Sequence, residues 1–422
     1  MSFDEIVYYI FANLIVIAPV SYLLAKRGIV FIPPLFYVFF VWLFLVAGIP
    51  LANKVSVLGG YSFSYSMNYM IVLLALILPA VSFCMVVKGK ETKGHLMSTL
   101  NEKGSLGFFY CLWVVSVFGV STYTVLFGLP PLFDSVSLLG SSSEIYSLRM
   151  SVTYGEGYRK YDVFFILIPG IATLLGAFLQ RRGVLRTWVF WVSVLFYCLL
   201  SFSFLHKSHM IVFILSMFLI FYFFSEKTLI KSFLMPFLVS LGLLLVTYIF
   251  YIGIDGYSVG DLLIMILQRV LVPYVVSLDF VLNNFGSDIP LLMGASFPNP
   301  KGLFDFETVY LSNLLMNLIA GKPEGTVPAP SVGFLYANFG FIGVLINSVI
   351  IFSYFILLYL IIKKFRSPLG FVVWVYLSVS AFNFSVRDPF GVVDLWVFIV
   401  LFSFILWKIT LNVCKKGSER CT

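Results

Sequence analysis

Runs of about 20 apolar residues recur along almost the whole chain, and they limit its fold more than any other feature. A run of this length is long enough to cross the roughly 30 Å hydrocarbon layer of a bilayer as a helix. Lipid offers the backbone no hydrogen-bond partners, so a spanning segment must be a helix or part of a closed barrel. Barrel strands alternate apolar and polar residues, whereas these runs are unbroken. The sequence therefore predicts an all-α, polytopic membrane protein.

The composition fits this prediction. Of the 422 residues, 61% are hydrophobic and only 11% are charged, whereas a soluble domain carries roughly 25% charged residues. We expect about eleven transmembrane helices in a single integral membrane domain covering residues 1–422. The predicted spans are 5–24, 29–49, 67–87, 104–128, 162–180, 187–205, 210–224, 233–254, 333–361, 369–385 and 391–411.

Basic residues gather in alternate loops between these spans. They are Lys26, Arg27, Lys88, Lys90, Lys93, Lys103, Arg181, Arg182, Arg186, Lys227, Lys231, Lys363, Lys364, Arg366, Lys408, Lys415, Lys416 and Arg420. By the positive-inside rule this side is cytoplasmic, which places the N-terminus outside and the C-terminus inside. The net charge of +8 is then explained by topology, and we expect no nucleic-acid partner.

The predicted outer side has a shorter loop at 50–66 and two long loops at 129–161 and 255–332. Within the second long loop, 262–282 is apolar enough to be mistaken for a span. A crossing there would place Lys363 and Arg366 outside, against the positive-inside rule. We therefore expect this stretch to stay on the outer side of the membrane.

The same stretch carries polar residues at helical spacing. At about 100° per residue, Asp261, Gln268 and Asp279 fall on one stripe of a helix, and Pro273 should kink it. This pattern is typical of a helix that lies in the interface or re-enters the membrane. We expect the outer loop to contain re-entrant or interfacial helices of this kind.

Four outer cations are candidates for binding a ligand: Arg149, Arg159, Lys207 and Arg269. A charged group at membrane depth costs free energy and calls for a reason. The functional hypothesis is a cationic cavity for a lipid-linked phosphate or diphosphate, because guanidinium groups match phosphate oxygens and stay charged. The alternative is that each cation snorkels, pairs with a nearby acid or meets lipid headgroups. For Arg387 an ion pair with Asp388 is the preferred interpretation.

A general base could come from His206 or His209 in a short outer turn, or from Glu156 in the first long loop. Histidine titrates near neutral pH, which suits this role. The alternative is a polar turn at the interface. The chain has no nucleotide-binding loop, zinc-protease motif or nucleophile elbow. We therefore expect no metal and no cofactor.

Two stretches carry a family resemblance. They are Gly294-Ala-Ser-Phe-Pro-Asn-Pro300 and Pro330-Ser-Val-Gly-Phe-Leu-Tyr-Ala-Asn-Phe-Gly-Phe-Ile-Gly343, with Lys322-Pro323 between them. Together with the large outer loop, they resemble the bacterial Wzy family of O-antigen or capsular repeat-unit polymerases. The resemblance implies a fold like that of C-type glycosyltransferases and a location in the bacterial inner membrane.

The resemblance also implies an activity. The donor would be a glycan on undecaprenyl diphosphate, and the acceptor would be a sugar hydroxyl of a new lipid-linked oligosaccharide. Arg149 and Arg269 would stabilise the departing diphosphate, with Arg159 and Lys207 in support. The family further implies a chain-length regulator protein as a partner, besides the substrate and the bilayer.

Two other functions remain open. An O-antigen ligase would use the same kind of donor but deliver the glycan to lipid A core. A flippase or transporter would move the lipid-linked oligosaccharide without chemistry. Transporters often show inverted repeats or broken helices in matching halves, and neither sign is visible in the sequence.

Overall fold

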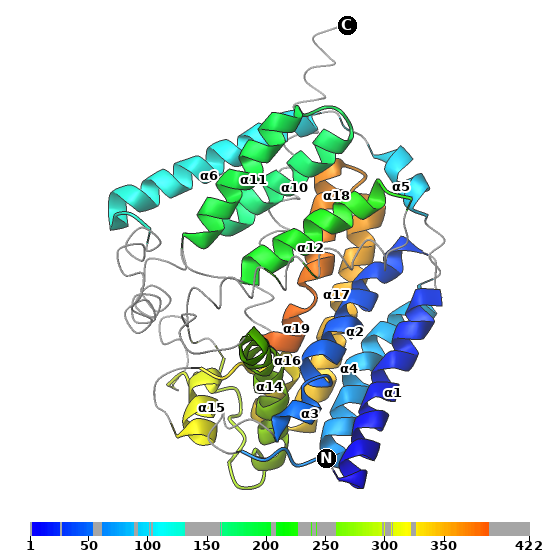
Figure 1. The fold of residues 1–422 in the computed structure, drawn as a ribbon, viewed down its shortest axis with the longest axis vertical. Coiled ribbons are helices and arrows are strands. Elements are labelled where there is room, and N and C mark those ends of the chain that lie inside the picture. Colours follow the sequence, from blue (N-terminus) through cyan, green and yellow to red (C-terminus); the bar gives the residue numbers. More distant parts are fainter. Residues whose placement is uncertain are drawn as a thin grey trace, which may run out of the picture. The chain divides into compact units, whose positions relative to one another are not determined.

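The part of the chain that the computed structural model describes is mostly helical (Figure 1). The structure describes residues 2–25, 28–53, 61–87, 92–100, 102, 104–130, 161, 163–203, 208–226, 238, 242, 259–297, 299, 305, 307–321 and 326–387. Within these ranges there is no β-strand, only an isolated bridge between Phe285 and Ile289. The helical prediction is confirmed.

Seven helical stretches within the described ranges are long and apolar enough to cross a membrane. They are Phe3–Leu23, Ile29–Ala52, Met67–Val86, Ser105–Phe127, Val163–Arg181, Phe341–Lys364 and Pro368–Val386. Several present large apolar side chains to the outside, including Phe118, which is 73% exposed. Extended apolar surface of this kind is typical of contact with lipid. The architecture is therefore compatible with a polytopic membrane protein.

The chain divides into two compact units. The first unit comprises Met1–Thr92, Leu263–Leu360 and Ser380–Val400, and the second comprises Lys93–Leu262, Ile361–Val379 and Leu401–Thr422. Both units contain helices that could span a membrane.

The first unit is built on the helices that precede residue 92. Its elements are α1 (Phe3–Ala25), η1 (Ile29–Phe31), α2 (Ile32–Leu45), α3 (Ile49–Ala52), α4 (Met67–Val86), most of α14 (Val259–Asn284), α15 (Leu311–Ala320), α16 (Ser331–Phe339), most of α17 (Phe341–Lys364) and α19 (Asn383–Val386). Helices α1, α2 and α4 pack on one another. Phe355 of α17 joins them through ring contacts with Tyr37 and Phe83.

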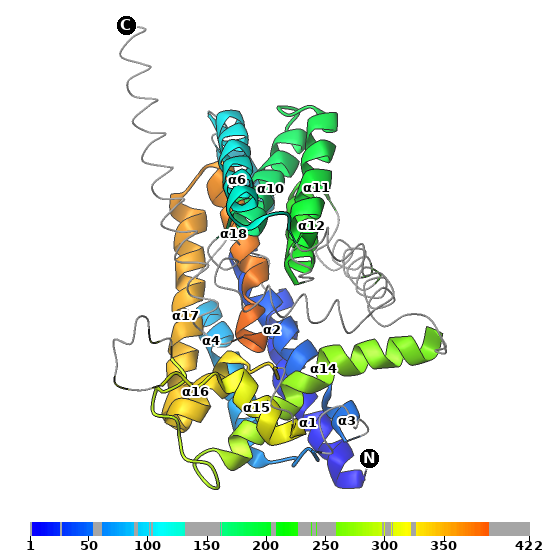
Figure 2. The same ribbon diagram turned by 90° about the vertical axis from the view of Figure 1, so that its left-hand side faces the viewer.

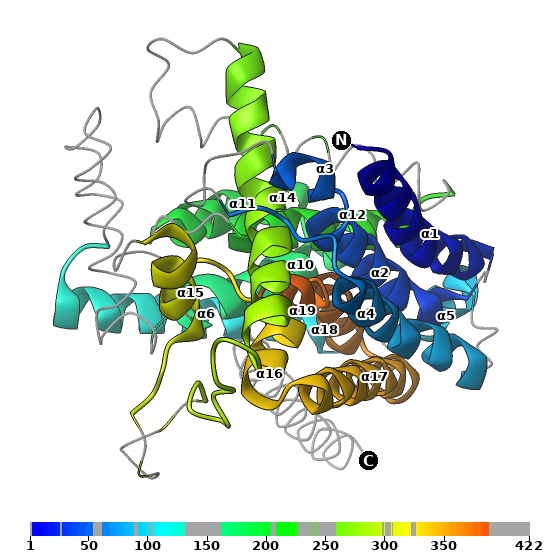
Figure 3. The same ribbon diagram turned by 90° about the horizontal axis from the view of Figure 1, so that it is seen from below.

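Helix α14 is 26 residues long. Figures 2 and 3 show it running across the direction of α17. The helix continues through Pro273 as one element. Gly48 lies against it so closely that an added Cβ would sit 2.6 Å from the carbonyl oxygen of Leu271. That α14 belongs to the outer loop rather than to the spans remains a prediction.

The second unit is centred on α10 (Ile168–Arg181). Its other elements are α5 (Lys93–Thr99), α6 (Ser105–Phe127), the π-helical turn η3 (Val163–Leu167), α11 (Thr187–Phe202), α12 (Ser208–Phe223) and most of α18 (Pro368–Ser380). Helix α10 packs on α6, α11 and α12. Phe371 of α18 makes ring contacts with Phe178 and Phe223.

The turn η3 is tied to α6 at two neighbouring positions. Ser116 donates a hydrogen bond of 2.8 Å to the carbonyl oxygen of Phe164. Gly119 faces the ring of Phe164, with which an added Cβ would collide. The hydroxyl of Ser116 therefore supplies a partner for a carbonyl in the widened turn, where α-helical bonding is interrupted.

One predicted span is wrong at its beginning. The sequence predicts a single helix over 333–361, but α16 ends at Phe339 and α17 begins at Phe341. The chain turns at Gly340, which has a φ of +62°, a conformation that glycine adopts without strain. The apolar pattern continues through this turn, because α16 is itself buried from Ser331 to Asn338. Because the residues on both sides of the turn are apolar, hydropathy alone did not reveal the break between α16 and α17.

The predicted count of eleven spans remains a prediction. Helices α11 and α12 correspond to the predicted spans 187–205 and 210–224, but each has only 16 residues. The predicted spans 233–254 and 391–411 fall outside the residues described, apart from two isolated positions in the first. Most of the predicted loop 129–161 also lies outside them.

Candidate functional site

Of the seven residues predicted to form the site, the structure describes two. Arg149, Glu156, Arg159, His206 and Lys207 lie outside the described residues. His209 is half-buried near the start of α12, in the second unit, and Arg269 lies on α14, in the first unit. The two therefore do not meet within one unit, and their joint role stays a prediction.

Arg269 is an exposed residue of α14. Ile264 and Leu267, on the same stretch of the helix, are 54% and 42% exposed. The helix becomes buried shortly afterwards, at Leu271 and Val272. A guanidinium beside exposed apolar side chains is suited to the boundary between hydrocarbon and water, where Arg keeps its stem in apolar surroundings and its charge in a polar layer.

Asp279, near the other end of α14, is the centre of a buried polar cluster. The residue has no exposed surface. Its Oδ2 accepts hydrogen bonds from the Tyr61 hydroxyl at 3.0 Å and the Ser64 amide at 2.8 Å. Its Oδ1 accepts from the Ser64 hydroxyl at 2.7 Å and from Nδ2 of Asn283 at 3.0 Å. One carboxylate thus joins α14 to the segment 61–66 that leads into α4.

Segment 61–66 alternates aromatic and serine residues, and the aromatic rings pack around the cluster. Tyr61 makes an edge contact with Phe280 of α14 at 5.5 Å between ring centroids. Phe63 makes edge contacts with Tyr65 at 4.9 Å and with Tyr69 at 5.2 Å. The Phe63 amide also donates to Oδ1 of Asn53 at 2.6 Å. These contacts exclude water from Asp279.

Burial sets the electrostatics of this cluster. It raises the pKa of the Asp279 carboxyl above its ordinary value, while the hydrogen bonds from Ser64, Tyr61 and Asn283 act in the opposite direction. Burial also raises the pKa of Tyr61, with the charge of Asp279 as the next cause. Perturbed titration of a buried group outside the spans is typical of a functional site, although structural clusters also show it.

The structure shows that the polar positions predicted on this helix differ in burial. Asp261, Gln268 and Asp279 were predicted on one stripe of a helix, and within it Asp279 is fully buried whereas Gln268 is half-buried. The side chain of Asp261 lies outside the described part of the chain. The reason for the difference is tertiary, because segment 61–66 covers the position of Asp279. The only hint in the sequence is the Tyr-Ser-Phe-Ser-Tyr-Ser pattern of this segment.

The two stretches that carry the family resemblance pack directly on each other. Asn338, which is fully buried, accepts from the Gly294 amide at 3.0 Å and donates to the Ser296 hydroxyl at 2.6 Å. The rings of Phe297 and Phe334 stack at 5.8 Å between centroids. Gly333 of α16 faces Leu278 of α14. The motif residues therefore form one structural unit with α14.

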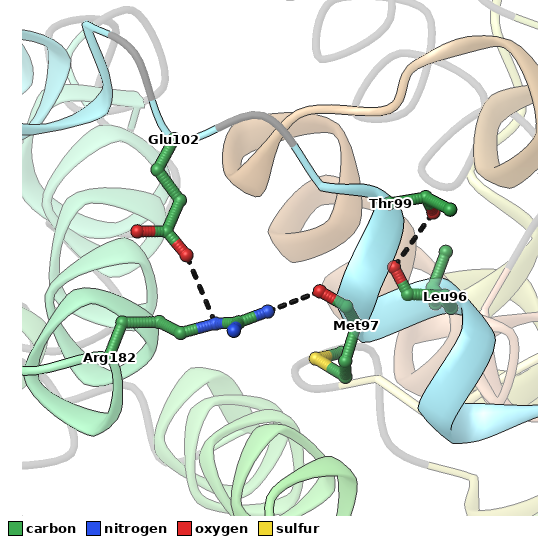
Figure 4. A network of polar contacts seen from close by, with 5 residues as sticks. All are labelled: Leu96, Met97, Thr99, Glu102 and Arg182. Atoms are coloured by element: carbon green, nitrogen blue, oxygen red, sulfur yellow. Dashed lines mark hydrogen bonds and ion pairs between the residues drawn. The ribbon is translucent and has the colours of Figure 1, made fainter.

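A second polar network lies in the second unit, among residues that the sequence assigns to the cytoplasmic side. Figure 4 shows Arg182 between Glu102 and α5. Its Nε lies 3.1 Å from a carboxylate oxygen of Glu102, and its guanidinium donates to the carbonyl oxygen of Met97. It also lies near the rings of Phe178 and Phe224. The partners of Arg182 come from α5, from the segment after it, from α10 and from the end of α12. The network therefore connects helices of the second unit.

Lys93 of α5 binds the end of α12 in the same unit. Its ammonium donates to the carbonyl oxygens of Tyr222 and Ser225 and lies over the Tyr222 ring. Burial lowers its pKa, and Glu226 opposes this shift. A cation at the last carbonyls of α12 complements the negative end of the helix dipole. Lys93 and Arg182, which in the sequence serve only to predict orientation, therefore also stabilise contacts between helices.

Comparison with known proteins gives no relative for this chain. No protein-family model, no curated protein and no solved structure matches it. Within the described ranges, no three His, Cys, Asp or Glu side chains come together in a group that could hold a metal ion.

Proposed function

We propose that the chain is a glycosyltransferase of the bacterial inner membrane that polymerises undecaprenyl-diphosphate-linked oligosaccharide repeat units into O-antigen or capsular polysaccharide. One observation carries the proposal, and it is the position of Arg269. The residue is exposed on α14, which the charge distribution predicts to stay on the outer side, and exposed apolar side chains accompany it. A lipid diphosphate presents the matching combination of an anionic group and acyl chains.

The proposed reaction needs the chemistry that such a position supplies. An acceptor sugar hydroxyl attacks the anomeric carbon of the donor glycan, and the bond from that carbon to the diphosphate oxygen breaks. The leaving diphosphate takes the electron pair, and a guanidinium stabilises the charge that develops on it. Arg269 takes this role, together with Arg149 and with support from Arg159 and Lys207. His206, His209 or Glu156 receives the proton of the hydroxyl.

The packing of the motif residues supports the same proposal. The Leu292 amide donates to the carbonyl oxygen of Ala337 at 2.9 Å, and the Met293 amide donates to that of Asn338 at 3.1 Å. Gly333 of the second motif lies beside Leu278 of α14. The second stretch that resembles the Wzy family therefore contacts the helix that carries Arg269, and the chain just before the first stretch is hydrogen-bonded to the second.

Deletion of the gene in its host tests the proposal against its two rivals. A polymerase mutant leaves a single repeat unit attached to lipid A core when surface glycan is separated on a gel. A ligase mutant leaves no glycan attached while long chains remain on the carrier. A flippase mutant accumulates units on the inner leaflet. Either of the last two patterns rejects the proposed activity.

Substitution of Arg269 tests the residue. We expect Arg269→Ala to reduce long chains by about 100-fold, the loss typical of removing one electrostatic contact to a transition state. Arg269→Lys should retain part of the activity, because the charge remains but the planar fork is lost. The matched control is Arg186→Ala, which removes an exposed arginine at the start of α11. Full ladders from Arg269→Ala, at normal protein levels in the membrane, would remove this residue from the mechanism.

A further inference from the structure

The Asp279 carboxylate makes most of the hydrogen bonds that attach segment 61–66 to α14. Its four hydrogen bonds to neighbouring groups involve Tyr61, Ser64 and Asn283, and three of them come from the segment. Asn283 also donates to the Ser64 hydroxyl at 2.8 Å, and the ring of Tyr61 packs on Phe280. Asp279 is therefore the titratable group on which this attachment is centred.

The segment is also what separates Asp279 from solvent on this side. Asp279 has no exposed surface, whereas Ser62 and Ser64 are exposed. Ser64 contacts the carboxylate through both its amide and its hydroxyl. Movement of the segment away from α14 would break these contacts and open a path for water to the carboxylate.

The closed arrangement accommodates both forms of the carboxyl group. The hydroxyls of Tyr61 and Ser64 can each donate or accept a hydrogen bond. If Oδ2 carries a proton, it can donate to the Tyr61 oxygen and still accept from the Ser64 amide. Protonation therefore removes the buried charge without removing the contacts that hold the segment.

We propose that segment 61–66 is a flap whose closure on α14 is coupled to protonation of Asp279, so that acid favours the closed flap and alkali favours the open one. This coupling belongs to the fold and does not depend on the enzymatic function proposed above.

The direction of the pH dependence follows from the linkage between proton binding and flap closure. In the closed flap, burial raises the pKa of Asp279, whereas in the open flap the carboxyl is exposed and has an ordinary pKa of about 3.9. The closed form therefore binds the proton more tightly. The extra stability that protonation gives the closed flap over the open flap is fully present below the ordinary pKa. It is lost as the pH rises through the raised pKa. Each unit of difference between the two pKa values changes the ratio of open to closed flap by about tenfold.

The other titratable groups around Asp279 do not produce this dependence. Among the described residues, those that interact with it are Tyr8 of α1, Tyr61 and Tyr65 of the segment, and Tyr69 of α4. Tyrosine has an ordinary pKa of about 10 and stays neutral between pH 4 and 8. Glu5 acts on Tyr65, so it is the described carboxyl that a control must address.

Hydrogen exchange of the full-length protein in lipid nanodiscs tests the proposal. Peptides covering 61–66 are followed by mass spectrometry from pH 4.5 to 8, with labelling times scaled to the intrinsic exchange rate at each pH. The amides of Phe63 and Ser64, both hydrogen-bonded in the closed flap, are the reporters. We expect their protection to fall with rising pH, by about tenfold per unit of pKa difference.

Variants assign the effect to Asp279. Asp279→Asn should make protection independent of pH, because the amide does not titrate. Glu5→Gln and Asp288→Asn, which remove a half-buried and an exposed carboxylate of the same unit, should keep the dependence of the unchanged protein. A flat profile in the unchanged protein, or an unaltered slope in Asp279→Asn, would overturn the proposal.

A second variant covers the possibility that Asp279→Asn does not fold. Tyr61→Phe keeps the carboxyl group and removes one of its hydrogen bonds. We expect lower protection at every pH with the slope retained. Protection equal to that of the unchanged protein at every pH would show that these contacts do not hold the flap, and the proposal would fail.

Discussion

At the scale of residues, Asn338 joins groups from separate parts of the first unit. Its Oδ1 accepts from the Gly294 amide, and its Nδ2 donates to the Ser296 hydroxyl and to the carbonyl oxygen of Phe334 at 2.8 Å. The side chain is fully buried, so water cannot replace these bonds. A buried polar group that loses its partner leaves an unsatisfied donor or acceptor, which costs about 1–3 kcal/mol.

Replacement of this residue should therefore destabilise the unit. We expect Asn338→Ala to lower the free energy of unfolding by about 3 kcal/mol, because it leaves the Gly294 amide and the Ser296 hydroxyl without their present partner. Thermal unfolding of the purified protein in detergent measures the effect. Asn313→Ala, at a half-buried position of α15, is the control and should change the midpoint much less. Equal midpoints for the two variants would contradict the prediction.

Single residues also show which features can be recognised in the sequence and which depend on the fold. Arg269 could be singled out because a cation in an apolar stretch is visible in the sequence itself. Asp279 could not, because its partners Tyr61 and Ser64 lie 218 and 215 positions away along the chain. Helical periodicity placed Asp279 on a polar face, but only tertiary contact decides whether that face meets water.

At the scale of elements, the turn between α16 and α17 depends on close contact between backbones. Gly343, near the start of α17, lies against the carbonyl of Leu335 in α16, with which an added Cβ would collide. Gly340 between them has a positive φ. The two helices therefore meet at a distance that only glycine permits, and the apolar pattern of 333–361 did not reveal this requirement.

For this reason, two glycine-to-alanine substitutions should change the stability of the protein in opposite directions. Gly343→Ala should destabilise the protein by about 2 kcal/mol, because the methyl group forces the helices apart. Gly107→Ala, in α6, has nothing within 4 Å of the added Cβ. There the smaller conformational freedom of alanine should stabilise the helix by up to about 1 kcal/mol. Thermal unfolding of both variants measures the difference, and two shifts in the same direction would refute the proposed contact.

At the scale of the whole molecule, hydropathy was sufficient to predict the class of fold. Each of the seven stretches that could cross a membrane overlaps a predicted span. The positive-inside rule alone kept 262–282 out of the list of predicted spans, because its apolar content would allow a crossing. Hydropathy could not divide the chain into two units, because that division depends on contacts between residues distant in sequence.

The predicted orientation can be tested by cysteine accessibility. The five native cysteines are first replaced by serine, and single cysteines are then introduced at Asp288, which follows α14, or at Lys364, at the end of α17. We expect a membrane-impermeant maleimide to label the cysteine at 288 in intact spheroplasts, and the cysteine at 364 only after lysis, because of the positive-inside rule. The reverse pattern would invert the topology and place Arg269 on the cytoplasmic side.

The widened turn η3 has a consequence for how this chain tolerates changes of length. A π-helical turn contains about one residue more than an α-helical turn, and each residue rotates a helix by about 100°. Loss or gain of a residue within Val163–Leu167 would therefore re-aim the residues that precede it, while the buried face of α10 kept its neighbours. A one-codon insertion or deletion could therefore change the direction in which the chain arrives at Val163, provided that a carbonyl oxygen still accepts a hydrogen bond from Ser116.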